Sequence, residues 1–411
     1  MRQPLENDAV KILQVVDDFP PYIAGDGIHV RQISKELSKR DHDVTVLTTV
    51  KSLSNSYVHT EKNRSAQAQE ANMNSAGEQE RTGGVRVRRF RRLFQFSYFS
   101  FSLKLCTTIL NGNFDLIHIH RYFSLQACPA MYISKLKGKP IIFTPHSATT
   151  REQKSILATL LKKTFDCTFG RYLIRSPNML IALTQDNIRD YLELGAKADR
   201  IRLVPNGIDL KKFRHLPDPS RFLTKHEITD EVVLFVGRLV RYKGVHHLLQ
   251  IAPKILAEFP KTKFVIVGPD YGYKNELLKL VKTLGLQKSV VFTGAISDSE
   301  LLEAYAAADV LAFPSIHEGF GLVLLEAMAC RKPIVTWKTS AMQYVVENQK
   351  SGILVSPWNL GDFAKSIVLL LSDKKLAKDM GEKGRKTVEG KFEWKSVVDS
   401  LEEIYEEAIA R

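Results

Sequence analysis

The chain has 411 residues, of which 44% are hydrophobic and 25% are charged. This balance is typical of a globular protein of roughly two domains, and it excludes a mainly disordered chain, a collagen and a small disulfide scaffold. Lys and Arg number 59 against 45 Asp and Glu, a formal net charge of +14. An excess of this size is compatible with nucleic acid, an anionic membrane surface or phosphorylated substrates, and it does not choose among them.

Cysteine spacing and hydropathy restrict the class of protein further. The four cysteines are widely spaced and include no C-x-x-C pair: Cys106, Cys128, Cys167 and Cys330. Buried free thiols in a reducing cytoplasm are therefore expected, and neither a disulfide framework nor a structural zinc site. No stretch approaches the roughly 20 apolar residues that span a bilayer, and the N-terminal run MRQPLENDAVKILQVV does not look like a signal peptide. We expect a cytoplasmic protein, soluble or peripheral on the inner face of the membrane.

The first half of the chain alternates short β-branched runs with helical patterns. Val30, Ile33 and Leu37 repeat at the spacing of an amphipathic helix. Residues 51–84 are polar, with almost no large apolar side chains, which predicts a long disordered loop. Strands are expected at residues 10–16, 43–49, 85–90, 115–120, 140–145, 179–184 and 201–206.

The second half repeats this alternation after a break near residues 211–222. The segments NELLKLVKTLGL and DSELLEAYAAA have helical spacing. Strands that alternate with helices predict parallel, doubly wound sheets, here two Rossmann-like domains facing each other. Ligands of such sheets bind outside the C-terminal strand ends, so the site is expected in the cleft between the domains. Further strands are expected at residues 232–237, 263–268, 290–294, 310–315, 333–337 and 352–356.

The segment PSIHEGFGLVLLEAMACRKP (314–333) is the most specific motif. A strand ends just before it, Glu318 and two glycines follow, and a helix is expected from about Leu322 that carries Glu326. The glycines allow the backbone to pass close to a ligand, and a helix N-terminus suits a phosphate. The two carboxylates can accept hydrogen bonds from sugar hydroxyls, Glu326 from a ribose. Such a turn beside acidic residues is also common in proteins without this function.

This segment resembles the E-x7-E signature of the retaining glycosyltransferases of family 4, which have the GT-B fold. Four other segments are similar to parts of that family, so the resemblance covers nearly the whole chain: residues 17–48, 204–213, 236–255 and 290–315. It implies an enzyme of the hexosyltransferase type that uses a nucleotide sugar, such as a UDP- or GDP-sugar, and a carbohydrate or lipid-linked acceptor. Cys330 stands where the family usually has Gly, and Gly25-Asp26-Gly27 replaces its usual Gly pair.

Two cations follow a predicted strand of the second half. Arg238 and Lys243 could hold a diphosphate together and stabilise the charge on a leaving nucleoside diphosphate, a role that the resemblance also implies. The alternative is two exposed basic residues on a loop. Asp17 and Asp18 are interpreted as loop residues, so no metal ligands are predicted and we expect a metal-free mechanism without a cofactor. The expected donor-binding residues are Gly25, Gly27, Gly237, Arg238, Lys243, Glu318, Gly319, Phe320, Gly321, Leu322, Val323 and Glu326.

Histidines close two strands of the first half. His118 and His120 point the same way along DLIHIH, and the resemblance implies that His120 contacts the donor sugar near the reacting carbon. With Glu318, Arg238 and Lys243 it completes the expected catalytic set. His146 and Asn206 are assigned to the acceptor side, the latter in a turn at the domain junction. No obvious acid ends these strands; by resemblance, the leaving phosphate oxygen takes the acceptor's proton, and Glu318 holds sugar hydroxyls.

Residues 85–104, VRVRRFRRLFQFSYFSFSLK, mix five Arg with many Phe. A strand followed by a loop and a helix start explains them, and contact with an anionic membrane surface is the main alternative. Nucleic acid would use stacking and charge in the same way, but no nucleic acid is expected.

The resemblance also gives a domain organisation and leaves other functions open. Residues 1–212, completed by a C-terminal helix at 393–411, are expected to form the acceptor-side domain, and residues 213–392 the donor-binding domain. A catalytically silent sugar-nucleotide-binding or scaffold protein could use the same fold. A sugar-nucleotide epimerase or a phosphorylase could use the same cleft.

Overall fold

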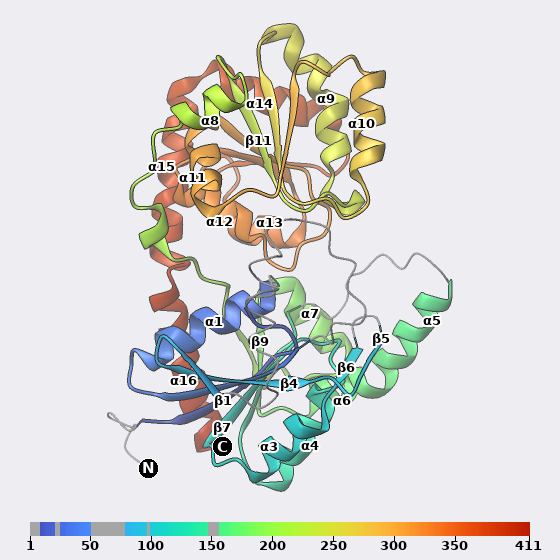
Figure 1. Cartoon of the computed structure of the whole chain (residues 1–411), viewed down its shortest axis with the longest axis vertical. Coiled ribbons are helices and arrows are strands. Elements are labelled where there is room, and N and C mark those ends of the chain that lie inside the picture. Colours follow the sequence, from blue (N-terminus) through green and yellow to red (C-terminus); the bar gives the residue numbers. More distant parts are fainter. Residues whose placement is uncertain (1–8, 21–24, 51–78, 97–98, 147–155) are drawn as a thin grey trace. The chain divides into compact units, whose positions relative to one another are not determined.

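The computed structural model describes residues 9–20, 25–50, 79–96, 99–146 and 156–411. The chain divides into two compact units. Unit 1 comprises Met1–Pro205 and Trp394–Arg411, and unit 2 comprises Asn206–Glu393. Figure 1 shows a sheet with helices around it in each unit.

Unit 1 contains an eight-stranded sheet in the order β10-β9-β8-β7-β1-β2-β4-β3. All neighbouring strands are parallel except β3, which is antiparallel to β4. The strands are β1 (Lys11–Val15), β2 (Asp43–Val50), β3 (Gln79–Thr82), β4 (Val85–Arg91), β7 (Leu116–His120), β8 (Ile141–Thr144), β9 (Met179–Ala182) and β10 (Ile201–Leu203). A separate hairpin consists of β5 (Phe94–Phe96) and β6 (Phe99–Phe101). The helices are α1 (Gly25–Ser38), α3 (Leu103–Asn111), α4 (Ala127–Leu136), α5 (Ile156–Phe165), α6 (Arg171–Arg175), α7 (Gln185–Glu193) and α16 (Trp394–Ala410).

The prediction of a disordered loop at residues 51–84 is wrong at the C-terminal end of this range. Gln79–Thr82 form strand β3, which pairs with β4. Gly83 and Gly84, with φ of 59° and 87°, connect the two strands. A two-residue hairpin turn with positive φ at both positions favours glycine, so the Gly pair indicates the hairpin although the flanking residues are polar. Residues 51–78 lie outside the described part of the chain.

The central strand of unit 1 is buried on both faces, because side chains alternate along it. Leu13 and Val15 belong to one core cluster, which includes residues of α3 and α4. Ile12 belongs to a second cluster, with α1 and α16. The C-terminal helix contributes its apolar face, including Trp394, to this second cluster and packs against α1.

Unit 2 contains a six-stranded, entirely parallel sheet in the order β13-β12-β11-β14-β15-β16. In chain order this is 3-2-1-4-5-6, the arrangement of a doubly wound dinucleotide-binding fold. The strands are β11 (Val232–Val236), β12 (Lys263–Val267), β13 (Val290–Gly294), β14 (Val310–Phe313), β15 (Ile334–Trp337) and β16 (Ile353–Val355). The helices are α8 (Ser220–Lys225), α9 (Val245–Glu258), α10 (Lys274–Thr283), α11 (Asp298–Ala307), α12 (Leu322–Ala329), α13 (Ser340–Val345), α14 (Leu360–Ser372) and α15 (Lys374–Lys391). The two parallel-sheet α/β domains predicted from the sequence are confirmed.

Polar side chains fix where several unit 2 helices begin. Ser297 accepts a hydrogen bond from the backbone N–H of Glu300 at 3.2 Å and caps α11. Asn359 caps α14 and Asp373 caps α15 in the same way. A capped N–H group already has a hydrogen-bond partner, so side chains of the protein satisfy these helix N-termini.

The cysteines are free, as expected, but they are not all buried. Cys106 and Cys330 are buried, whereas Cys128 is half-buried and Cys167 is exposed. Among the described helices, none combines the length and the apolar composition needed to cross a membrane.

Candidate functional site

Each sheet has one topological switch point, a pair of neighbouring strands from which the chain continues to strands on opposite sides of the pair. In unit 1 this point lies between β1 and β7, since β2 lies on one side and β8 on the other. In unit 2 it lies between β11 and β14. Ligands of open α/β sheets bind outside the carboxyl ends of the strands at such a point. The predicted site residues lie largely at these two positions.

Lys243 and Glu318 form an ion pair in unit 2. Lys243 precedes α9 after β11, and Glu318 follows β14, so the topology brings them together. The ammonium Nζ donates to Glu318 Oε1, and each side chain is only 11% exposed. The ammonium also lies 5.3 Å from the ring centre of Phe313. Because both side chains are largely buried and bind each other, their positions are fixed before any ligand binds.

Arg238 follows β11 in the same loop as Lys243, and its side chain is oriented by two tyrosines. Its Nη2 donates to the hydroxyl of Tyr242 at 3.0 Å. Its guanidinium lies over the ring of Tyr271, 5.4 Å from the ring centre. Arg238 itself is exposed, so the guanidinium remains accessible to an anion.

The turn into α12 presents backbone N–H groups. Gly319 is exposed and Phe320 is buried, and Gly321 is the N-cap residue of α12 in the left-handed conformation, with φ of 93°. Glycine has no side chain that could accept a hydrogen bond from the helix start. The first N–H groups of α12, at Leu322 and Val323, are therefore not capped by the side chain of the N-cap residue. Such a helix start suits a phosphate.

Glu326 lies one turn further along α12, where its carboxylate is held by a tyrosine. Burial raises the pKa of this carboxyl from 4.5 to about 6, against the lowering effect of a hydrogen bond from Tyr305. The Tyr305 hydroxyl donates to Glu326 Oε2 at 2.8 Å. Cys330, on the next turn, is 1% exposed and its thiol pKa is raised to about 12, mainly by burial. The cysteine at this position is therefore a neutral packing residue.

His118 and His120 of unit 1 belong to one chain of hydrogen bonds. Tyr405 of α16 lies within hydrogen-bond distance of Gln14, at 3.1 Å, and of His118 Nδ1, at 2.7 Å. His118 Nε2 lies 2.7 Å from the hydroxyl of Thr144, and His120 Nε2 lies 2.7 Å from Gln14 Oε1. The rings of His118 and His120 are 4.1 Å apart, on the same face of β7 as predicted.

His146 continues this chain beyond β8. Its Nε2 lies 3.1 Å from His120 Nδ1. Burial, followed by the charge of Arg121, lowers the pKa of His146 from 6.5 to about 3. Burial also lowers the pKa of His120 well below its ordinary value. Both imidazoles are therefore neutral at pH 7 and can exchange hydrogen bonds with uncharged groups.

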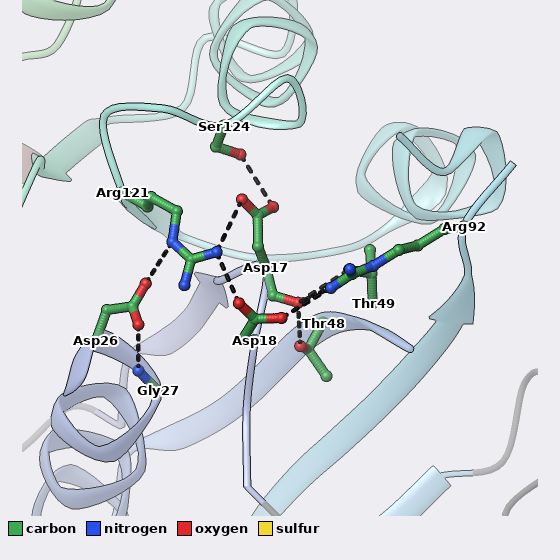
Figure 2. A network of polar contacts seen from close by, with 9 residues as sticks. All are labelled: Asp17, Asp18, Asp26, Gly27, Thr48, Thr49, Arg92, Arg121 and Ser124. Atoms are coloured by element: carbon green, nitrogen blue, oxygen red, sulfur yellow. Dashed lines mark hydrogen bonds and ion pairs between the residues drawn. The ribbon is translucent and has the colours of Figure 1, made fainter. Parts of the chain in front are cut away.

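A cluster of carboxylates and arginines lies beside these histidines. Figure 2 shows Arg121 between three carboxylates: its Nε donates to Asp26 at 2.6 Å, and its Nη1 donates to Asp18 at 2.8 Å and lies 3.7 Å from Asp17. Arg92 donates to the other oxygen of Asp18 at 2.8 Å. Burial raises the pKa of Asp17 to about 7, although Arg121 lowers it, whereas the two arginines hold the pKa of Asp18 below its ordinary value.

Sequence reasoning missed this cluster. It interpreted Asp17 and Asp18 as loop residues and assigned nothing to Arg121. The available signal was topological. Asp17 follows β1 and Arg121 follows β7, and adjacent parallel strands place both residues at the same edge of the sheet. Arg92 follows β4 and Asp26 lies in α1, and no local sequence pattern relates these two residues to Asp17 and Arg121.

The remaining predicted residues divide between the units. Gly25 and Gly27 lie in the first turn of α1, in unit 1, with His120 and His146. A Cβ on Gly27 would lie 2.4 Å from the carbonyl oxygen of Asp18, so this close approach requires glycine. Gly237 follows β11 in unit 2, and Asn206 begins that unit and is 7% exposed.

Two family models match the chain. One, described as Glycosyltransferase Family 4, matches residues 23–212, and the other, Glycosyl transferases group 1, matches residues 219–387. A D-inositol 3-phosphate glycosyltransferase of Corynebacterium jeikeium is 30% identical over 307 residues, which cover 72% of this chain and 73% of that protein. A glycogen synthase of Mycobacterium tuberculosis is 24% identical over 96% of this chain and 94% of its own.

Solved structures resemble the whole chain. Anabaena Alr3699/HepE, solved in complex with UDP and glucose, has a TM-score of 0.73 at 20% identity, over 96% of this chain and 98% of that one. A sucrose-phosphate synthase from Thermosynechococcus elongatus has a TM-score of 0.72 at 22% identity, over 97% and 99%. These likenesses support the fold, and the sequence matches support the family. The chain belongs to glycosyltransferase family 4 and is a glycosyltransferase of the hexosyltransferase type with the GT-B fold.

Proposed function

We propose that the protein transfers a sugar from a nucleoside-diphosphate sugar to a carbohydrate or lipid-linked acceptor, with retention of configuration and without a metal ion. The observation that carries this proposal is the Lys243–Glu318 pair at the β11/β14 switch point, beside the glycine-capped start of α12. We assign donor binding to unit 2 and the acceptor side to unit 1.

The groups of unit 2 suit a leaving diphosphate. Lys243 and the exposed guanidinium of Arg238 are cations on the loop between β11 and α9, and the start of α12 adds N–H groups. Groups already oriented toward a position where negative charge develops stabilise the transition state more than the ground state. They would do here what a divalent cation does in metal-dependent transferases. Glu318 then holds sugar hydroxyls, and Glu326 holds the ribose.

The groups of unit 1 favour a same-face route over a double displacement. The carboxylates of Asp17 and Asp18, which follow β1, pair with Arg121, and Asp18 also pairs with Arg92, which makes them poor nucleophiles. His120 is neutral and suits a hydrogen bond to a donor-sugar hydroxyl, with His146 on the acceptor side. In this route the leaving phosphate oxygen accepts the acceptor's proton while the glycosidic bond forms on the face that the phosphate leaves.

The segment at residues 85–104 is proposed as a contact with an anionic membrane surface, where a lipid-linked acceptor would lie. Several of its arginines also have partners within unit 1: Arg86 binds Asp43, Arg89 donates to the carbonyl of Pro20 at 2.6 Å, and Arg92 binds Asp18. Sedimentation with vesicles of zwitterionic lipid, with and without anionic lipid, tests the contact. Binding that does not depend on anionic lipid contradicts it.

Turnover of purified protein against a panel of nucleotide sugars in the presence of a chelator tests the main proposal. UDP-sugars come first, because one similar structure was solved with UDP-glucose. We expect release of one nucleoside diphosphate, its loss in Glu318→Ala, and a product whose anomeric proton coupling matches that of the donor. Glu382→Ala, at an exposed ion pair with Arg331, is the matched control. Nucleotide binding without turnover, with lipid and sugar acceptors supplied, would instead support a silent binding protein.

A further inference from the structure

Three histidines from separate segments of unit 1 converge on one point. His29 lies in α1, His120 ends β7, and His146 follows β8. One ring nitrogen of each lies within 4.8 Å of those of the other two. The positions are far apart in the sequence and form no metal-binding motif, so only the fold brings them together. His29 and His120 are buried, and His146 is half-buried, which leaves the cluster one accessible side.

The spacing of the nitrogens is close to that of a metal centre. Zinc–imidazole bonds of about 2.0–2.1 Å in tetrahedral geometry place ligating nitrogens roughly 3.4 Å apart. His120 Nδ1 and His146 Nε2 are 3.1 Å apart. The ring centre of His29 is 5.0 Å from that of His146 and 5.8 Å from that of His120. Its ring nitrogen lies within 4.8 Å of those of the other two, so a side-chain rotation of His29 completes the triangle.

The hydrogen-bond chain also orients the central imidazole for a metal. The amide of Gln14 donates to Tyr405 through Nε2, so its Oε1 accepts, and His120 Nε2 must carry the proton. The lone pair of His120 is therefore on Nδ1, directed toward His146. A ligating histidine that donates its other ring N–H to a carbonyl oxygen is the usual supporting arrangement around protein metal sites.

We infer that His29, His120 and His146 bind one divalent transition-metal ion of the kind that prefers imidazole, of which Zn²⁺ is the reference. Three neutral nitrogen ligands leave the fourth position for water.

The ion would oppose the reaction. It would occupy the Nδ1 face of His120, and a donor-sugar hydroxyl could not contact that face at the same time. On the basis of the proposed function, Zn²⁺ therefore inhibits transfer and a chelator restores it. Metal binding itself is measured without donor or acceptor, so failure of the site and failure of the proposed reaction are distinguishable.

The first test uses the full chain carrying Cys167→Ser, because an exposed thiol is a competing ligand. Chelator-treated protein is titrated with Co²⁺ and then Zn²⁺. We expect one ion per chain, the visible absorption of tetrahedral Co²⁺, and an X-ray absorption spectrum of the 1:1 Zn²⁺ complex that requires three imidazoles. A spectrum with sulfur ligands or fewer than three imidazoles, or no saturable binding, would overturn the inference.

Substitutions then locate the ion. His29→Gln and His146→Gln are each expected to weaken Zn²⁺ binding by more than tenfold. Gln14→Leu, which removes only the support of His120, should weaken it by about 10–100-fold with the stoichiometry unchanged. His246→Gln is the control, because His246 and His247 form an adjacent pair in unit 2 that should not contribute. Wild-type affinity in both His29→Gln and His146→Gln would place the ion elsewhere and contradict the inference.

Discussion

The two switch points have the same topology and different electrostatic character. In unit 1 the sheet edge carries buried, neutral histidines and a carboxylate–arginine cluster whose members bind one another. In unit 2 the corresponding edge carries an exposed arginine, a lysine held by one glutamate, and an uncapped helix start. A doubly wound sheet thus fixes where a site lies, while burial and local pairing decide which chemistry it offers.

Removal of Arg121 is expected to have the largest effect on the free energy of unfolding, because it removes the cation that pairs with the carboxylates at the unit 1 edge. Arg121→Met leaves Asp17 and Asp26 buried without their cation, and loss of one partner from a buried ion pair costs about 3–5 kcal/mol. We expect unfolding of unit 1 at correspondingly lower urea concentration, measured by hydrogen exchange of its peptides.

Arg189→Met is the matched control for this substitution. Arg189 is 73% exposed and pairs with Asp186 within one helix, so its loss should cost at most about 1 kcal/mol. Equal effects of the two substitutions would mean that the Arg121 cluster is no more than a surface network.

Asp17→Asn is expected to change how stability depends on pH. The native pKa of Asp17 is about 7, above the ordinary 3.8, so between these values the native state binds more protons than the unfolded state. Stability from this group therefore falls as pH rises through this window, by about 3 kcal/mol between pH 5 and pH 8. An asparagine side chain does not titrate, so Asp17→Asn should not show this loss of stability between pH 5 and pH 8.

Urea unfolding at pH 5 and pH 8 measures this difference. Asp379→Asn, at an exposed carboxylate that pairs with Lys383, removes the same charge without burial. If the wild type and Asp17→Asn lost stability equally between the two pH values, the raised pKa would be refuted.

The sequence predicted the sheets well because their signal is local. Every strand expected from a β-branched run is present, and α12 begins at Leu322 as expected. The missed features depend on tertiary contacts. Strand β3 has a polar sequence and is fixed by its pairing with β4, and the Arg121 cluster joins residues from several elements. Similarly, Tyr242 and Tyr271 give no signal as partners of Arg238 until the loops are folded.

In unit 2, Lys243→Met tests the other sheet edge, where the charged groups are expected to bind a ligand and contribute little to folding. Under the proposed function it removes a cation from the leaving diphosphate, and we expect turnover to fall by about 100-fold, equivalent to about 2.7 kcal/mol. Steady-state kinetics should show the loss mainly in kcat. Lys383→Met, at an exposed ion pair with Asp379, should leave turnover unchanged. A change confined to KM would argue against stabilisation of the transition state.

Tyr305→Phe is expected to have the smallest effect and tests whether burial alone sets the Glu326 carboxyl. The Tyr305 hydroxyl stabilises the carboxylate by a 2.8 Å hydrogen bond, and without it the pKa of Glu326 rises further above about 6. If the carboxylate accepts a ribose hydroxyl, nucleotide affinity falls as the pH drops through that pKa. One hydrogen bond of about 1 kcal/mol corresponds to a shift of roughly 0.7 pH units. The midpoint of a calorimetric pH titration of nucleotide binding should therefore move upward by that amount, whereas a midpoint that stays in place would assign Glu326 to packing.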